Sequence, residues 1–443
     1  MAKQKIVIIG GGAAGTTCAF ELRKLNKKAE ITIIERTGNL EYSPCALPYV
    51  LAGEIDSFDD IFVFKRSDYD NNDINLLLNT AVTSIDKKAK KVSYTAEGKE
   101  GELEYDELVL ATGSVPKLPP IPELEKAKPF VLKTIADAKR ISENINSDDR
   151  SVIIGAGLVG LELAIALNEQ GEKVTVLEAQ DHLLPGILDK DMSDRISQYL
   201  ADIGVELLVN TKIEQIEKEK VHLKDNSLSF DKLCVCTGMQ ASTGLAEQAG
   251  LDCGEAIDVN EQLQTSDENI YACGDCVLST EMNTGKKILS QLGTIAVRQG
   301  KTVARNILGQ EEQTPAVVNN TITKMGEMFV GSVGITLERA RQEGFEAVAA
   351  KYSGEVRSEY YPPSSRITVK LISDKNGKLL GGQIIGREEV AGRMNMLSLA
   401  IGQGMTLDDL IDTETCYNPA SAPINEPVSV AAEIGKKKIQ SLN

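Results

Sequence analysis

One pattern, found twice, constrains the fold of this chain more than any other. It consists of a short apolar run, a G-x-G-x-x-G, a helical stretch and a second apolar run that ends in an acid, and its two copies lie at residues 5–35 and 151–178. A nearly continuous apolar run is typical of a strand buried on both faces, as in a parallel sheet covered by helices. The sequence therefore predicts an α/β chain with two Rossmann-like dinucleotide-binding units.

The fingerprint glycines have distinct physical reasons. The first permits a tight turn, the second lets the backbone approach a diphosphate, and the third lets the helix pack closely on the strand. The diphosphate then lies at a helix N-terminus, where free N–H groups and the macrodipole favour negative charge. The positions expected to contact the two dinucleotides are Gly10, Gly12, Ala14 and Gly15 in the first copy and Gly155, Gly157 and Gly160 in the second.

An acid closes the second strand of each copy. Glu35 and Glu178 are placed to accept hydrogen bonds from the adenosine ribose hydroxyls. A carboxylate at position 178 would repel a ribose 2′-phosphate, and no arginine follows it closely. The second copy is therefore expected to bind NADH, with NADPH less favoured.

Composition excludes several classes of protein. A length of 443 residues predicts two to four domains, and a net charge of −17 disfavours nucleic acid and anionic membranes as partners. No apolar stretch is suited to a membrane span or a signal sequence. Eight cysteines are few for this length, which favours a cytoplasmic protein with one or more special thiols. His182 and His222 are the only histidines, so we expect no histidine-rich metal site.

Two such units, the second beginning after residue 150, resemble the two-dinucleotide-binding flavoproteins, also called pyridine nucleotide-disulfide oxidoreductases. Segments 106–113, 231–238 and 265–275 support the resemblance. It implies FAD and NADH as cofactors, with Asp275 bonded to the ribityl chain of the flavin. It further implies that Thr112 and Gly113 close the first FAD segment and that Gly238 is their counterpart in the NAD unit.

The same resemblance implies three domains. The FAD-binding domain would be discontinuous, over residues 1–112 and 250–325, with an NAD(P)H-binding domain at 113–249 inserted between. Prolines between residues 116 and 122 fit a boundary there. Residues 326–443 would form an α+β dimerisation domain, which implies a homodimer whose active site is shared across the interface.

The segment Tyr42-Ser43-Pro44-Cys45-Ala46-Leu47-Pro48-Tyr49 indicates the branch of the family. The glutathione reductase branch has a C-x4-C pair here, and the thioredoxin reductase branch has a C-x-x-C between positions that correspond to 150 and 250. This chain has neither. It resembles the single-cysteine branch of coenzyme A-disulfide reductases, NADH oxidases and peroxidases, and persulfide or polysulfide reductases, although Ala46 replaces the usual glycine and Pro44 the commoner asparagine.

Cys45 is the expected reactive thiol. Pro48 fits only near a helix start, so Cys45 is expected at a helix N-terminus, where the dipole lowers a thiol pKa. The resemblance places this sulfur against the flavin, so that electrons from NADH would reopen a mixed disulfide on Cys45. The alternative is a small buried hydrophobic residue.

The choice of acceptor depends on the neighbours of that thiol. Peroxidases and water-forming oxidases of this branch have a histidine where this chain has Ala13, which has no proton to donate. Segments 359–362 and 417–428 resemble those of coenzyme A-disulfide reductases. This resemblance implies that Tyr361 and Tyr417 bond a leaving thiolate across the dimer. The alternative is ordinary packing of the two tyrosines.

Coenzyme A would also need cations for its phosphates. The candidates in segments around Cys45 are Arg23, Lys24, Lys65 and Arg66, together with Ser43 beside the thiol, and the alternative is an ordinary solvated surface. Cys18, Cys234 and Cys236 are expected in the core. Cys273 and Cys276 overlay the FAD motif and are expected to be structural, whereas Cys416 adjoins Tyr417.

The sequence thus predicts an FAD-dependent NADH:disulfide oxidoreductase that acts on coenzyme A disulfide, a persulfide or a polysulfide through Cys45. Three alternatives stay open. One is an NADH oxidase that reduces O₂, another an NADH-dependent reductase of an electron-transfer protein such as rubredoxin, and the third a non-enzymatic nucleotide sensor.

Overall fold

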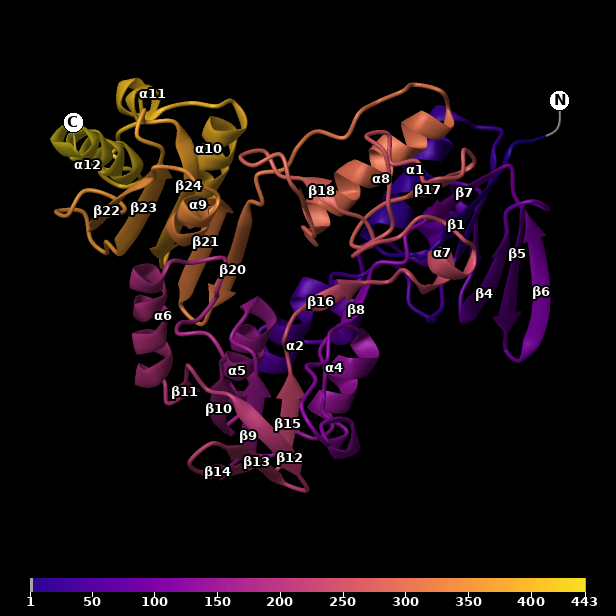
Figure 1. Ribbon diagram of the computed structural model, residues 1–443, viewed down its shortest axis with the longest axis horizontal. Coiled ribbons are helices and arrows are strands. Elements are labelled where there is room, and N and C mark those ends of the chain that lie inside the picture. The colour runs from indigo at the N-terminus through magenta and orange to yellow at the C-terminus, as the bar shows by residue number, and fades with distance from the viewer. Residues whose placement is uncertain (1–2, 443) are drawn as a thin grey trace.

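The computed structural model describes residues 3–442, and Figure 1 shows the first parallel sheet, near the N-terminus, together with its helices. Two distant stretches of the chain build this sheet, in the order β17-β7-β1-β2-β3. Its strands are β1 (Lys5–Ile9), β2 (Glu30–Ile34), β3 (Ile74–Leu77), β7 (Glu107–Leu110) and β17 (Ile270–Ala272). Helices α1 (Ala13–Leu25) and α8 (Gly293–Ile307) pack against each other, and Gly300 permits the contact because a Cβ there would lie 2.4 Å from the Ala14 carbonyl oxygen.

Smaller elements surround this first sheet. They are the antiparallel strands β4 (Thr80–Asp86), β5 (Lys91–Ala96) and β6 (Lys99–Glu104) and the helices α3 (Arg66–Asp70) and α7 (Gly244–Gln248). Helix α7 contacts β4, and Ala246 of α7 belongs to the same buried cluster as β1. The segment that contains α7 therefore packs on the first core.

The second parallel sheet has the order β11-β10-β9-β15. Its strands are β9 (Arg150–Ile154), β10 (Lys173–Leu177), β11 (Glu206–Leu208) and β15 (Lys232–Val235), and its helices are α4 (Ile135–Ser142), α5 (Leu158–Glu169) and α6 (Lys190–Asp202). An antiparallel sheet of β12 (Ile213–Glu217), β13 (Lys220–Leu223) and β14 (Ser227–Ser229) lies beside it (Figure 1). The predicted strand–helix–strand units are both present.

Two short strands connect the parallel-sheet units. β8 (Ser114–Pro116) leaves the first unit, β16 (Met239–Ala241) returns to it, and the two pair antiparallel (Figure 1). The chain thus crosses between the units twice at one place.

The C-terminal part is an antiparallel sheet with helices on both faces. The sheet order is β20-β21-β24-β23-β22, and the strands are β20 (Thr321–Met325), β21 (Met328–Gly334), β22 (Val348–Glu355), β23 (Arg366–Ser373) and β24 (Leu379–Gly386). One face packs on α10 (Val390–Gly402), α11 (Leu407–Asp412) and α12 (Pro427–Leu442), and the other on α9 (Leu337–Gln342). The chain enters this sheet at Thr321.

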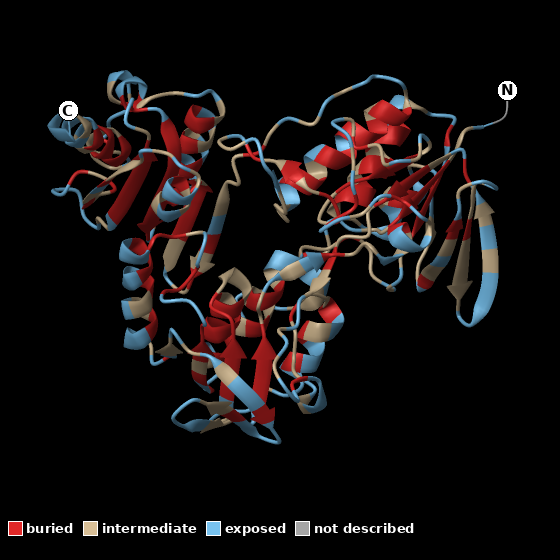
Figure 2. Cartoon of the chain, in the orientation of Figure 1, coloured by how far each residue is buried: buried red, intermediate tan, exposed pale blue. Residues whose placement is uncertain are grey.

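Helix α2 (Leu47–Ala52) lies where three parts of the molecule meet. Leu47 and Leu51 are buried in one cluster with Leu161 of α5 and with Met325 and Val330 of the C-terminal sheet. Figure 2 shows this shared core between the second parallel sheet and the C-terminal strands. Burial of a leucine side chain contributes roughly 2–3 kcal/mol, so these contacts fix the segment that carries Cys45.

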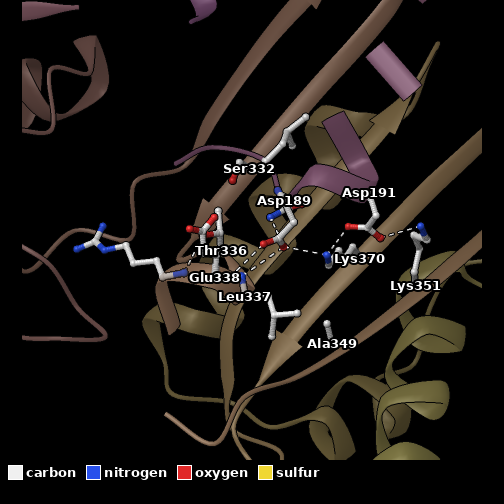
Figure 3. Close-up of polar contacts among 12 residues, drawn as sticks. Asp189, Asp191, Ser332, Thr336, Leu337, Glu338, Ala349, Lys351 and Lys370 are labelled. Atoms are coloured by element: carbon white, nitrogen blue, oxygen red, sulfur yellow. Dashed lines mark hydrogen bonds and ion pairs between the residues drawn. The ribbon is translucent and has the colours of Figure 1, made fainter. Parts of the chain in front are cut away.

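A buried group of charges also joins the second unit to the C-terminal sheet (Figure 3). The Asp189 carboxylate accepts hydrogen bonds from Lys370 Nζ at 2.9 Å and from Gln383 Nε2 at 2.9 Å. Lys370 also bonds Asp191, which pairs with Lys351 near the surface. Because both partners are satisfied, the charges are tolerated although Asp189 and Lys370 are buried.

No helix within residues 3–442 is long and apolar enough to cross a bilayer.

Candidate active site

The first glycine fingerprint forms a turn that only glycine can make. Gly10 has a φ of +109°, and a Cβ there would lie 2.1 Å from the Ala111 carbonyl oxygen. A Cβ on Gly15 would lie 2.0 Å from the Gly10 oxygen, so strand and helix are in backbone contact. Nothing lies within 4 Å of a Cβ built on Gly12, which precedes α1. The turn therefore leaves open space where a diphosphate would meet the helix N-terminus.

Glu35 is held at the end of β2 by the same loop. Its carboxylate accepts hydrogen bonds from the Gly11 N–H at 2.9 Å and from the Thr37 N–H at 2.8 Å. The Thr37 hydroxyl donates to it as well, at 2.9 Å. These bonds orient an acid beside the fingerprint, where it can accept hydrogen bonds from the hydroxyls of an adenosine ribose.

The second fingerprint repeats this geometry. Gly155 has a φ of +104°, and a Cβ there would lie 2.5 Å from the Cys236 carbonyl oxygen. Space is open beyond Gly157, and a Cβ on Gly160 would lie 2.1 Å from the Gly155 oxygen. The Glu178 carboxylate accepts the Ala156 N–H at 2.8 Å. The residues of both units thus fit a bound dinucleotide.

Asp275, Ser114 and Lys133 lie together beside the connection between the two units. The Ser114 hydroxyl donates to the Asp275 carboxylate at 2.9 Å, and Lys133 Nζ lies 3.0 Å from that hydroxyl and 3.4 Å from the carboxylate. Thr112 donates to the Ser242 carbonyl oxygen at 2.8 Å, and Gly113 has a φ of +68°. Lys133 was not predicted, because 142 residues separate it from Asp275.

Cys45 lies in a 3₁₀ turn, Pro44–Ala46, directly before α2. It is exposed, which fits a thiol that meets a substrate. Its pKa is nevertheless raised above the ordinary value, first by burial of the surrounding site and next by the Glu162 carboxylate, while Lys133 lowers it. This direction is opposite to the predicted one. Helix α2 has six residues, and its dipole does not outweigh desolvation.

Glu162 is a second group that the sequence did not single out. It projects from α5, and its carboxylate accepts a hydrogen bond from the Thr323 hydroxyl of β20. Burial raises the pKa of Glu162 to about 7. Glu162 and Lys324, with Pro48 and Tyr49 of α2, line a small pocket. The signal available in the sequence was a carboxylate inside an otherwise apolar helix.

The predicted tyrosines Tyr361 and Tyr417 lie at the surface of the C-terminal part. The hydroxyl of Tyr417 lies 2.8 Å from that of Tyr360, and both side chains are exposed. Tyr361 is also exposed. Tyr360, the first tyrosine of the Y-Y-P segment, was not singled out in the sequence.

The predicted substrate cations fall into two groups. Arg23 is buried, and its guanidinium donates to backbone carbonyl oxygens that include those of Asn72 at 2.7 Å and Asp73 at 2.8 Å. Lys65, Arg66 and Lys24 are exposed; Arg66 pairs with Asp70 at 3.0 Å and Lys24 lies 3.7 Å from Glu21. Ser43 is half-buried, and its N–H donates to the Ile61 carbonyl oxygen.

The remaining cysteines separate by exposure. Cys18, Cys234, Cys273 and Cys276 are fully buried, and burial raises the pKa of each thiol. The Cys276 thiol donates to the Cys273 carbonyl oxygen at 3.2 Å, a bond that suits a structural thiol. Cys416 is exposed beside Tyr417.

Comparison with known proteins gives consistent results. The profile of the family described as pyridine nucleotide-disulphide oxidoreductase matches residues 4–300. The profile of the dimerisation domain of that family matches residues 322–426. Together these matches span most of the chain.

Individual relatives match over nearly their whole length. A protein from Methanocaldococcus jannaschii called NADH oxidase is 39% identical, covering 99% of this chain and 100% of the relative. A protein from Pyrococcus furiosus called NAD(P)H sulfur oxidoreductase (CoA-dependent) is 31% identical, covering 98% of this chain and 100% of the relative. The structure of an NAD-dependent persulfide reductase from A. fulgidus is 34% identical and superimposes with a TM-score of 0.94, covering 99% of this chain and 84% of that one.

Proposed function

We propose, from the premise that this chain belongs to the pyridine nucleotide-disulphide oxidoreductase family, that it reduces a small disulfide or persulfide through Cys45. The chain is an NAD(P)H-dependent flavin oxidoreductase of the kind to which its relatives belong. The observation that carries the proposal is an exposed thiol directly before α2, a helix whose leucines pack on the second unit and on the C-terminal sheet. The best substrate candidates are coenzyme A disulfide and coenzyme A persulfide.

We assign FAD to the first unit, where the Gly10 turn, Glu35 and Asp275 would hold it. Bound FAD would supply the electron pair, taken from NADH, that reopens a mixed disulfide on Cys45. The second unit would hold NADH through the Gly155 turn and Glu178. Because the Glu178 carboxylate is fixed by the Ala156 N–H at 2.8 Å, it is oriented to accept ribose hydroxyls and to repel a 2′-phosphate.

The thiol chemistry belongs to Cys45. The Cys45 thiolate attacks one sulfur of the substrate disulfide, so that a new S–S bond forms to Cys45, the old bond breaks and one thiolate leaves. Lys133 is the cation that favours the thiolate form, since it lowers the pKa of Cys45 against burial and Glu162. Lys133 therefore supports the reactivity of this sulfur.

The leaving thiolate needs a donor, and we assign this role to the tyrosine pair of the partner subunit in a homodimer. The match to the dimerisation domain supports the homodimer. Tyr417 and Tyr360 present exposed hydroxyls to such a partner, as an active site shared across the interface requires. Lys24, Lys65 and Arg66 are the exposed candidates for binding substrate phosphates, whereas Arg23 is occupied by backbone carbonyls. We place this chemistry in the cytoplasm, where all eight cysteines would stay free.

Reduction of O₂ is the second candidate function. The name of the Methanocaldococcus relative favours it. Against it, Ala13 lies in the first turn after the fingerprint and offers no proton for an oxygen intermediate. We therefore rank O₂ below a disulfide as the physiological acceptor.

The test compares acceptors in the purified enzyme with bound FAD. We expect NADH turnover with coenzyme A disulfide under nitrogen to exceed turnover with O₂ alone. Cys45→Ser should lower disulfide turnover at least about 100-fold, since the residue is the nucleophile. Cys416→Ser, which removes the other exposed thiol, is the matched control and should change little. Equal disulfide turnover in the wild type and in Cys45→Ser would refute the proposal.

A further inference from the structure

A serine hydroxyl lies between an ammonium group and a carboxylate beside the connection of the two units. The Ser114 hydroxyl donates to Asp275 Oδ2 at 2.9 Å and accepts a hydrogen bond from Lys133 Nζ at 3.0 Å. Lys133 Nζ lies 3.4 Å from the same carboxylate oxygen, longer than the roughly 2.7–2.9 Å of a direct charge-assisted hydrogen bond. The ammonium is therefore held to the carboxylate mainly through the serine.

The backbone around Ser114 fixes the place of this hydroxyl. Ser114 begins β8 and pairs with Ala241 of β16, and the preceding Gly113 carbonyl oxygen accepts the Ser242 N–H at 2.9 Å. Ser114 is only 6% exposed, so water competes little for its hydrogen bonds. A hydroxyl can donate once and accept as well, and here it donates to the anion and accepts from the cation.

The segment that carries Lys133 also packs on the segment that carries Cys45. The Ile135 N–H donates to the Tyr42 hydroxyl at 3.3 Å, which ties the start of α4 to a residue three positions before the thiol. Ile135 is buried in one cluster with Leu47, the first residue of α2, and the helices α2 and α4 are in contact. The ammonium is thus anchored where the first unit, the second unit and the thiol segment meet.

Charged groups of both signs act on the thiol from the elements packed around it. Burial and the Glu162 carboxylate of α5 raise the pKa of Cys45, Lys133 lowers it, and the Asp275 carboxylate raises it further. A carboxylate in direct contact with an ammonium offsets most of its charge at a third group. The effect of Lys133 on Cys45 therefore depends on how closely Lys133 approaches Asp275.

We propose that Ser114 is a positioning residue whose hydroxyl keeps Lys133 apart from Asp275, so that the ammonium stays available to the Cys45 thiolate. The proposal rests on the function proposed above, in which Cys45 is the nucleophile. When the Cys45 S–H bond breaks, its proton passes to solvent and the electron pair stays on the sulfur, where the ammonium offsets the new negative charge. Without the hydroxyl, the ammonium would bond the carboxylate directly and the thiolate would lose that compensation.

The experiment measures how fast iodoacetamide alkylates Cys45 at a series of pH values in the full-length enzyme with bound FAD. Only the thiolate reacts, so the rate reports its population and needs no substrate. Mass spectrometry of the Cys45 peptide separates this reaction from that of Cys416, another exposed thiol.

The variants isolate the Ser114 hydroxyl. Ser114→Val and Ser114→Thr add similar bulk, and only the threonine keeps a hydroxyl. Thr237→Val is the matched control, because it deletes a different hydroxyl from the same connection, one that donates to the Lys117 carbonyl oxygen at 2.6 Å. Ser114→Ala repeats the test without added bulk in β8.

We expect Ser114→Val and Ser114→Ala to slow alkylation at neutral pH by about three- to tenfold, the worth of one hydrogen bond, and to move the profile to higher pH. Their rates should converge with that of the wild type in alkaline solution, where the thiolate forms without help, whereas general damage to the site would slow alkylation at every pH. Ser114→Thr and Thr237→Val should stay within about twofold of the wild type. In a Lys133→Met background, Ser114→Val should have no further effect, because the hydroxyl acts through the lysine.

The positioning role and the proposed function fail separately. Alkylation profiles that do not depend on the hydroxyl at position 114, or a Ser114→Val effect that persists in full in the Lys133→Met background, would overturn the positioning role while disulfide turnover stayed normal. Full disulfide turnover in Cys45→Ser would refute the proposed function, whereas the alkylation series would still decide whether Ser114 acts on Cys45 through Lys133.

Discussion

The fingerprint turns of the two dinucleotide units have nearly the same local geometry, yet the helices that follow them pack against very different surroundings. The first glycine has a φ of +109° in one unit and +104° in the other, and the acid accepts a loop N–H at 2.9 Å in one and 2.8 Å in the other. Helix α1 packs on α8, within the first unit. Helix α5 instead packs on α2 and β20, which belong to other parts of the chain.

That difference gives the carboxylates of the two fingerprint helices different surroundings, since Glu21 of α1 pairs with Arg305 of α8. Four residues after its first residue, α5 has Glu162, whereas α1 has Thr17 at the matching place. The half-buried carboxylate of Glu162 in α5 is stabilised by the Thr323 hydroxyl of β20, which donates to it. The repeat therefore supplies nucleotide binding, and the contacts with other parts of the chain supply the chemistry.

The largest expected difference between the two units comes from a matched pair of variants, Gly10→Ala and Gly155→Ala. Each new Cβ would lie within 2.5 Å of a backbone carbonyl oxygen, at a φ that alanine avoids. Gly10→Ala should lose bound flavin and all activity. Gly155→Ala should keep its flavin spectrum and lose at least about 100-fold in NADH turnover, a barrier change of about 2.7 kcal/mol. Equal flavin content in the two variants would contradict the assignment of FAD to the first unit.

A second pair of variants tests the buried ion pair that attaches the second unit to the C-terminal sheet. Lys370→Met would leave the buried Asp189 carboxylate without its cation, and we expect a loss of about 3–5 kcal/mol in the free energy of unfolding. Lys351→Met is the control, because its partner Asp191 is 43% exposed at the side chain, and it should cost under about 1 kcal/mol. Denaturant titration measures both, and similar losses would show that burial does not set the strength of this network.

The pH dependence of the free energy of unfolding should also distinguish the two fingerprint helices, because of Glu162 in α5. Its pKa is raised to about 7, so the folded protein binds a proton there more tightly than the unfolded chain, whose carboxyl titrates near 4.5. Stability contributed by this group is therefore complete below pH about 4.5 and is lost as the pH rises to about 7, by at most about 3 kcal/mol. Glu162→Gln should remove that part of the slope of unfolding free energy against pH. Thr17→Val, the α1 counterpart, should leave the slope unchanged.

Two other buried carboxyls make the Glu162 measurement more specific. Burial also raises the pKa of Glu41 and of Glu107 to about 7. Their contribution should persist in Glu162→Gln, so the slope should decrease by about one proton and not vanish. A slope identical to that of the wild type would show that Glu162 is ionised in the folded protein at low pH.

The smallest expected effect concerns the acids that end the two strand pairs. Glu178→Ala should lower the preference for NADH over NADPH about 10- to 100-fold in kcat/KM, since the repulsion of a 2′-phosphate is removed. Glu35→Ala should weaken retention of FAD and leave the coenzyme preference unchanged. A shift of preference in Glu35→Ala would mean that the two units had been assigned in the wrong order.

Local rules account for what the sequence predicted well. Neighbours within a few residues determine the strands, the turns at Gly10 and Gly155 and the start of α2 near Cys45. The local sequence pattern therefore predicts them. The side chains of the candidate site that the local pattern did not predict are brought together by packing between distant segments. Thr323 meets Glu162 across 161 residues, and the contact between the hydroxyls of Tyr360 and Tyr417 spans 57 residues. The pKa of Cys45 was mispredicted because desolvation and Glu162 come from outside its own segment.

The paired strands β8 and β16 have a consequence for how such a protein can change over time. Because the chain leaves the first unit at Ser114–Pro116 and returns beside the same place at Met239–Ala241, the intervening stretch is a cassette with adjoining ends. One genetic exchange between those two points would replace the coenzyme specificity of the enzyme without cutting the flavin unit. The incoming cassette would have to retain a surface for Leu47 and an acid for Lys370, which makes the requirements for grafting short and explicit.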